Sequence, residues 1–210
     1  MSTIIKHEAI IKNLTTAAER AYRRGIQTGS GGNLSMRIEG EELMIISASG
    51  GSFIDCETSG SGWVITDFDA VKKDKNAASP SKESILHGYL YKQFANVKSI
   101  VHCHSPWVIT WANIADELPL VSWQATLKLK SPVPVFSQKQ PAVSANECEI
   151  ICDSLKRMSD FTCFILREHG LIATGNSAIE AEHQAEFLEE CAQIAVLKTL
   201  SGAPLFTGKA

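Results

Sequence analysis

Apolar residues recur at intervals near 3.6 in several segments of the chain, which is the spacing of a helix with one buried face. The first segment covers residues 4–22, and Gly25 is expected to end that helix. The second covers residues 81–94, with Pro80 just before it and Glu83 in its first turn. Three more helices are predicted, the last two opened by capping boxes with Ser at the N-cap and Glu three residues later: 106–112, 144–155 and 177–200.

Shorter apolar runs between turn-forming residues predict strands. Residues 48–62 are rich in Gly and Ser and are expected to form a loop, and the charged residues 72–75 are typical of a solvated connection. Several strand-to-strand links are too short for a crossover helix, so an α/β fold with mixed or antiparallel pairing is favoured over a parallel sheet. The predicted strands or extended segments are 33–38, 43–47, 63–66, 100–104, 132–136, 163–166 and 171–174.

Composition narrows the class of protein. The chain has 210 residues, of which 44% are hydrophobic and 20% charged, with a net charge of -3, so we expect one globular domain over residues 1–210. Nothing in this balance indicates nucleic acid or an anionic membrane as a partner. The six cysteines form no CxxC pair, and neither a signal peptide nor an apolar run of roughly 20 residues is present. These features predict a cytoplasmic protein with reduced thiols.

The most informative stretch is the run that ends in His102 and His104. Residues two apart on a strand project from the same face, so both imidazoles can reach one metal ion. Zinc in catalytic sites commonly takes three protein ligands, and His169, which also follows an apolar strand, is the best candidate for the third. The alternative is structural: strand histidines bonded to backbone carbonyls, and a His before Gly170 that only occupies a turn.

Other residues could carry chemistry beside such a metal. Glu83 near a helix N-terminus is expected to be ionised and is a candidate general base or fourth ligand, although it could be an ordinary helix-start acid. His87 lies four residues on, where a bond to Glu83 is possible, and has a supporting role at most. Three turns can point backbone amides at an anion, with Lys82 as a cation nearby, and they imply a phosphorylated substrate: Ser30-Gly31-Gly32-Asn33, Ser49-Gly50-Gly51 and Ser81-Lys82.

Taken in order, five short motifs resemble the class II aldolase and adducin head family. They are Gly31-Gly32-Asn33-Leu34-Ser35, Ser49-Gly50, Pro80-Ser81-Lys82-Glu83, Val101-His102-Cys103-His104 and His169-Gly170-Leu171-Ile172-Ala173. The resemblance spans residues 7–200. It implies a three-layer α/β/α fold around a mostly antiparallel sheet, and tetramers with sites at subunit interfaces.

The resemblance also assigns roles. It makes His102, His104 and His169 the ligands of a divalent metal, most often zinc, and Glu83 the acid/base carboxylate. It places seven residues at the substrate phosphate: Ser30, Gly32, Asn33, Ser49, Gly50, Ser81 and Lys82. Lys82 stands where the aldolases commonly have Ser, and a Lys also occurs in relatives near the decarboxylase branch.

The expected activity is cleavage of a carbon-carbon bond next to the carbonyl of a phosphorylated sugar or sugar acid. Sugar phosphate 4-epimerisation and sugar acid phosphate decarboxylation are the alternatives on the same site, and an adducin-like interaction module is the non-enzymatic one. Trp123 occupies the place of a tyrosine that donates a proton in fuculose phosphate aldolases. Because an indole N–H is not a practical general acid, cleavage of that particular sugar is in doubt.

Overall fold

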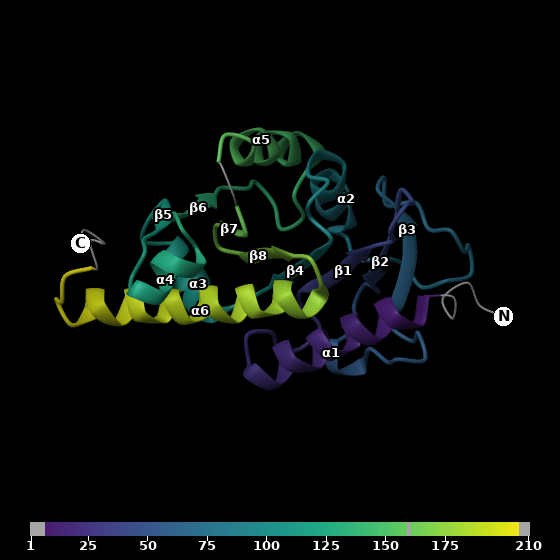
Figure 1. Cartoon of the computed structure of the whole chain (residues 1–210), viewed down its shortest axis with the longest axis horizontal. Helices are drawn as coiled ribbons and strands as arrows, with labels where there is room; N and C mark the ends of the chain where they lie inside the picture. Colours follow the sequence, from purple (N-terminus) through teal and green to yellow (C-terminus); the bar gives the residue numbers. More distant parts are fainter. Residues whose placement is uncertain (1–6, 159–160, 206–210) are drawn as a thin grey trace.

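In the computed structural model, residues 7–158 and 161–205 are described, and they fold into a mixed sheet with helices on both faces (Figure 1). The strand order is β3-β2-β1-β4-β8-β7-β6-β5. The strands are β1 Asn33–Arg37, β2 Leu43–Ser47, β3 Trp63–Asp67, β4 Ser99–Cys103, β5 Glu117–Leu118, β6 Val133–Phe136, β7 Cys163–Leu166 and β8 Gly170–Gly175. The helices are α1 Glu8–Arg24, α2 Ser84–Gln93, α3 Pro106–Ala112, α4 Trp123–Lys128, α5 Ala145–Leu155 and α6 Ala178–Leu200, with a 3-10 turn at Phe53–Asp55.

The sheet is mostly antiparallel, as predicted. Within the described residues, β6 and β7 form the parallel pair and the other ladders are antiparallel. β4 lies between β1 and β8, with His102 opposite Asn33 on one side and Ile172 on the other. Because β4 has a neighbour on each side, its end is fixed in position, and the site described below is built there.

Two hydrophobic cores make the fold three-layered, in agreement with the predicted architecture. Alternate residues of β4 face opposite cores: Val101 and Cys103 pack towards α1, α3 and α6, whereas Ile100 packs towards α2 and α5. Figure 1 shows α1 and α6 along one side of the sheet and α2 and α5 on the other. His102 shares its face with Ile100, so its side chain points to the layer that contains α2.

Most predicted elements are present, with shifts at their ends. α1 ends at Gly25, whose left-handed conformation (φ 73°) caps the helix as expected, while Ile4 lies outside the described residues. α2 begins at Ser84 rather than at residue 81, so Glu83 is its N-cap and not a residue of its first turn. Residues 81–84 form a turn instead, in which the Ser84 N–H donates to the Ser81 carbonyl at 3.1 Å, and the Ser81 N–H donates to the Ser47 carbonyl at 3.1 Å and ties this turn to β2.

The two predicted capping boxes differ from each other. The box of Ser144 and Glu147 is complete. At α6, Ser177 Oγ accepts from the Glu180 N–H as predicted, but the Glu180 carboxylate accepts from the Asn176 N–H at 3.0 Å, so that box is only half formed. The short elements β5 and α4 and the 3-10 turn were not predicted. The six cysteines, which all lie in the described part of the chain, are free and buried, and no described helix has the length and apolar character needed to cross a membrane.

Gly88 allows α2 to lie directly against the backbone that follows β3. A Cβ at this position would overlap the Phe68 carbonyl group, which cannot move without displacing the chain. We therefore expect Gly88→Ala to lower the free energy of unfolding by about 1–3 kcal/mol, the usual cost of overpacking. Denaturant unfolding measures this change. Gly51→Ala is the matched control, since its Cβ would meet nothing closer than 3.8 Å, and an equal loss in both variants would contradict the explanation.

Candidate metal centre

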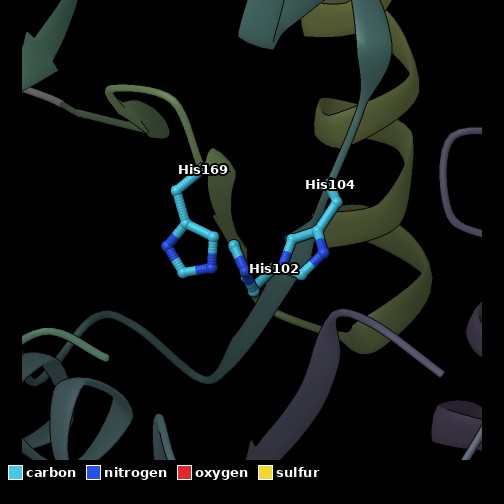
Figure 2. Close-up of side chains that lie close together, drawn as sticks. All are labelled: His102, His104 and His169. Carbon is cyan, nitrogen blue, oxygen red and sulfur yellow. The ribbon is translucent and has the colours of Figure 1, made fainter. Parts of the chain in front are cut away.

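Three histidine side chains converge at the end of β4. His102 lies on β4, His104 follows it, and His169 lies in the turn between β7 and β8. Their ring centroids are 4.7 to 4.8 Å apart, and Figure 2 shows the three rings turned towards a common space. One nitrogen from each ring lies within 4.8 Å of the others, which is the grouping a single metal ion requires.

Glycines make this convergence possible by allowing close backbone approach. Gly170 (φ 158°) lies against the Cys103 carbonyl so closely that a Cβ would overlap it. Gly32 (φ 69°) adopts a left-handed conformation, and a Cβ there would come within 2.6 Å of the His102 carbonyl oxygen. The β7–β8 turn and the loop before β1 therefore both press against the end of β4, and they bring their side chains with them.

The buried ligand candidate His102 has a defined tautomer. Its Nδ1 lies 2.8 Å from the Leu171 carbonyl oxygen, which can only accept, so Nδ1 carries the proton. The Nε2 lone pair is then free, and in the part of the chain that the structure describes this buried atom has no hydrogen-bond partner. The bond to a backbone carbonyl that a purely structural His would make is present, but it satisfies only one of the two ring nitrogens.

Burial keeps the three imidazoles neutral. Desolvation lowers the pKa of His102 to about 3 and that of His169 to about 4, and it also lowers the pKa of His104. Near pH 7 these rings are therefore in the neutral form that binds metal ions.

Glu83 faces two of these rings. Its Oε2 accepts from Asn33 Nδ2 at 2.8 Å and lies 3.2 Å from His102 Nε2, while its Oε1 lies 3.4 Å from His169 Nε2. The side chain is 7% exposed, and burial raises the pKa of its carboxyl against the opposing effects of the His169 ring and of the Asn33 bond. A buried carboxyl with a raised pKa beside such a cleft is a candidate for exchanging protons.

All seven residues predicted to hold phosphate line one cleft of about 500 Å³, together with Glu83, His104 and His169. A bridge between Ala48 and Pro80 and the bond from the Ser49 N–H to the Ser79 carbonyl hold the second and third turns side by side. Lys82 precedes α2 and is exposed, so its charge lies outside the helix. His102 lies beneath this cleft and is fully buried.

His87 does not contact the Glu83 carboxylate as its spacing allowed. The carboxylate turns instead to Asn33, His102 and His169. His87 Nδ1 lies 2.7 Å from Ser35 Oγ, which in turn lies 2.7 Å from the Tyr91 hydroxyl, and all three side chains are buried. This chain of polar groups packs behind the site, between α2 and β1.

Two glutamines that no sequence pattern marks as functional contact the histidines. Gln27 Oε1 accepts from the His104 N–H at 2.9 Å, and Gln138 Nε2 lies 2.8 Å from His169 Nδ1. Both come from loops distant in sequence from their partners, so local spacing could not select them. Trp123, in contrast, begins α4, is 60% exposed and is absent from the residues that line the cleft.

The residues present fit a divalent metal. Three neutral imidazoles converge, and two buried atoms of the site, His102 Nε2 and Glu83 Oε1, have no hydrogen-bond partner among the described residues. Orphaned buried polar atoms are costly, and a cation between them would satisfy both.

Comparisons with known proteins show the family to which the chain belongs. The family model described as the class II aldolase and adducin N-terminal domain matches residues 12–196. A 5-deoxy-D-ribulose 1-phosphate aldolase of Bacillus thuringiensis serovar kurstaki is 32% identical over 187 residues, covering 87% of this chain and 82% of the relative. A 3-oxo-tetronate 4-phosphate decarboxylase of Escherichia coli K12 is 28% identical over 199 residues, covering 92% and 90%.

Among solved structures, an L-fuculose-1-phosphate aldolase of Thermus thermophilus superimposes with a TM-score of 0.78 at 21% identity, covering 94% of this chain and 98% of that one. The chain therefore belongs to the class II aldolase and adducin family, whose enzymes use a divalent metal.

The contact between Gly31 and His104 generates a test of the site. A Cβ on Gly31 would lie 2.6 Å from His104 Nδ1, and the ring can relieve this overlap by swinging away from the other two histidines. We expect Gly31→Ala to weaken Zn²⁺ binding by about ten-fold or more while the fold is retained, measured by chelator competition with circular dichroism as the folding check. Gly51→Ala is the matched control, and unchanged affinity in Gly31→Ala would contradict the proposed contact.

The buried His87 predicts acid sensitivity. Desolvation lowers its pKa from 6.5 to about 3, so between these values the unfolded chain binds a proton that the native chain does not. Stability is then lost as the pH falls through this window. We expect His87→Gln, measured by urea unfolding of the metal-stripped protein from pH 7 to pH 4, to reduce the slope of unfolding free energy against pH by up to about 1.4 kcal/mol per unit.

The matched control for this measurement is His183→Gln, which removes an exposed histidine and leaves His87 in place. An unchanged slope in His87→Gln would refute the role of that buried imidazole.

Proposed function

We propose that this chain is a metal-dependent lyase that cleaves a carbon-carbon bond next to the carbonyl of a phosphorylated sugar or sugar acid. The observation that carries the proposal is the position of Glu83. Its carboxylate lies within 3.2 to 3.4 Å of two of the three convergent imidazoles, inside a cleft rimmed by turns suited to an anion. An interaction module has no need of this combination.

His102, His104 and His169 would hold the metal, and zinc is the ion we propose because three imidazoles with an open position suit it. When bound, the metal supplies Lewis-acid polarisation of the substrate's carbonyl end. Glu83 moves the proton at the reacting carbon, since its carboxyl is desolvated and beside the ligands. Asn33 holds the carboxylate in orientation through its bond to Oε2.

The seven cleft residues would bind the substrate phosphate: Ser30, Gly32, Asn33, Ser49, Gly50, Ser81 and Lys82. Turns contribute backbone and hydroxyl donors, and Lys82 adds a positive charge. Binding a group remote from the reacting carbon positions the substrate, so binding energy serves catalysis.

Two relatives each support one candidate reaction. The aldolase from Bacillus thuringiensis supports carbon-carbon cleavage, and the decarboxylase from Escherichia coli supports loss of carbon dioxide from a sugar acid phosphate as the second candidate. Lys82 favours this second candidate, whereas 4-epimerisation has no residue here that favours it. Trp123 argues against cleavage of fuculose phosphate, because an indole does not replace a tyrosine as proton donor.

The proposal extends to the assembly. We propose one domain over residues 1–210, a homotetramer with sites at subunit interfaces, and a cytoplasmic location, as the family resemblance implies.

The proposal is tested by incubating the Zn²⁺-loaded protein with a panel of phosphorylated ketoses and sugar acid phosphates. Dihydroxyacetone phosphate is the product expected from the ketoses that are cleaved, and carbon dioxide or an epimer would indicate the alternatives. Glu83→Gln is expected to lower turnover by about 10²- to 10⁴-fold, because it removes the proton-transfer group while preserving its shape. Turnover that survives both this substitution and removal of the metal would overturn the proposal.

A further inference from the structure

Gln138 lies against the face of the metal centre opposite Glu83. It follows β6 at its end, is partly buried, and its Nε2 lies 2.8 Å from His169 Nδ1 and 3.4 Å from the Pro141 carbonyl oxygen. Its Oε1 is buried and has no hydrogen-bond partner among the described residues. The amide therefore uses its donor end on the imidazole and leaves its acceptor end unused.

With the amide in this orientation, one tautomer of His169 is compatible with the contact. An amide nitrogen can only donate, so His169 Nδ1 must accept, and the ring proton is then on Nε2. That Nε2 lies 3.4 Å from Glu83 Oε1 and faces it. In this arrangement the Nε2 lone pair that a metal requires is replaced by an N–H.

His102 is arranged in the opposite way. Its Nδ1 donates to the Leu171 carbonyl, which leaves Nε2 free to bind a cation. One ligand is therefore already in the metal-binding tautomer and the other is not. Metal-bound histidines generally donate their second ring N–H to an oxygen, and the unpartnered Oε1 of Gln138 belongs to the amide that contacts His169 Nδ1.

The two ends of a primary amide have nearly the same size, so a half-turn of the Gln138 amide exchanges them within the same space. Oε1 would then accept from His169 Nδ1–H, and Nε2 of the histidine would become free. The bond lost is the long one to the Pro141 carbonyl.

We propose that Gln138 is a positioning residue whose amide donates to His169 in the metal-free protein and turns to accept from it when the metal binds. The inference rests on the metal site of the proposed function. Gln138 touches neither substrate nor metal and acts through the tautomer of one ligand.

Zn²⁺ affinity, measured by chelator competition, tests the role of the acceptor. Gln138→Met keeps the length of the side chain without an acceptor oxygen, and we expect it to weaken binding by about 10- to 100-fold. Gln138→Glu can only accept, so it holds His169 in the binding tautomer, and we expect affinity equal to or tighter than that of the unmodified protein.

Gln140→Met and Gln140→Glu are the matched controls, because Gln140 is an exposed residue of the same loop with no hydrogen bond to the histidines among the described contacts. Both are scored on metal affinity alone, and both are expected to retain it. Gln140→Glu also controls for an added negative charge near the site. If Gln138→Glu and Gln140→Glu both bind Zn²⁺ more tightly to the same extent, the effect is due to the added negative charge, and the inference is overturned.

The nitrogen chemical shifts of His169 provide a second readout that a merely structural role would not move. We expect the Nε2–H tautomer in the metal-free protein, Nδ1–H after addition of Zn²⁺, and Nδ1–H in Gln138→Glu even without metal. Nδ1–H in the metal-free unmodified protein, or equal affinity in Gln138→Met, would overturn this inference alone. Failure of the unmodified protein to bind Zn²⁺ would overturn the proposed metal site and this inference with it.

Discussion

Desolvation of three imidazoles and a carboxylate at the end of β4 is the constraint on which the rest of this structure depends. Buried polar groups cost free energy unless they are paired, and here the partners come from different parts of the chain: Leu171 for His102, Gln138 for His169 and Asn33 for Glu83. The same desolvation keeps the imidazoles neutral and raises the pKa of the Glu83 carboxyl. Desolvation thus accounts for the state of both the proposed metal ligands and the proposed proton-transfer group.

Packing between α2 and β1, on the side of the site away from the cleft, also maintains this arrangement. α2 carries Glu83 at its N-cap and His87 one turn later, and His87, Ser35 and Tyr91 form a buried polar chain between this helix and β1. Because Gly88 brings α2 against the backbone at Phe68, the helix has little freedom to shift. The position of one carboxylate therefore depends on close packing along the whole helix.

The antiparallel pairing could be predicted from the short strand-to-strand links, the three-layer architecture from the family resemblance, and the three histidines from their positions at the ends of apolar strands. His102 and His104 share a strand face, and alternation alone is sufficient to place them together. Gln27 and Gln138 could not be found in this way, since their contacts join loops that are 77 and 31 residues from their partners. The start of α2 was misplaced for a related reason, because residues 81–84 form a turn that a bond from the Ser81 N–H to the Ser47 carbonyl ties to β2. α4 was missed because it is a six-residue helix whose N-cap, Ser122, lacks a Glu three residues on.

The site residues are divided between paired elements of the fold and a loop. Asn33 and His102 lie on β1 and β4, Glu83 is the N-cap of α2, and His169 lies in the turn between β7 and β8. β4 is paired on both sides, with β1 and with β8. The opposite wall of the cleft comes from Gln140, Pro141 and Ala142, in a loop held to the site mainly through Gln138. Most of the site residues thus lie on or beside paired strands and at a helix N-terminus, while the wall formed by Gln140, Pro141 and Ala142 lies on a loop, the kind of segment in which sequence varies with least effect on the fold.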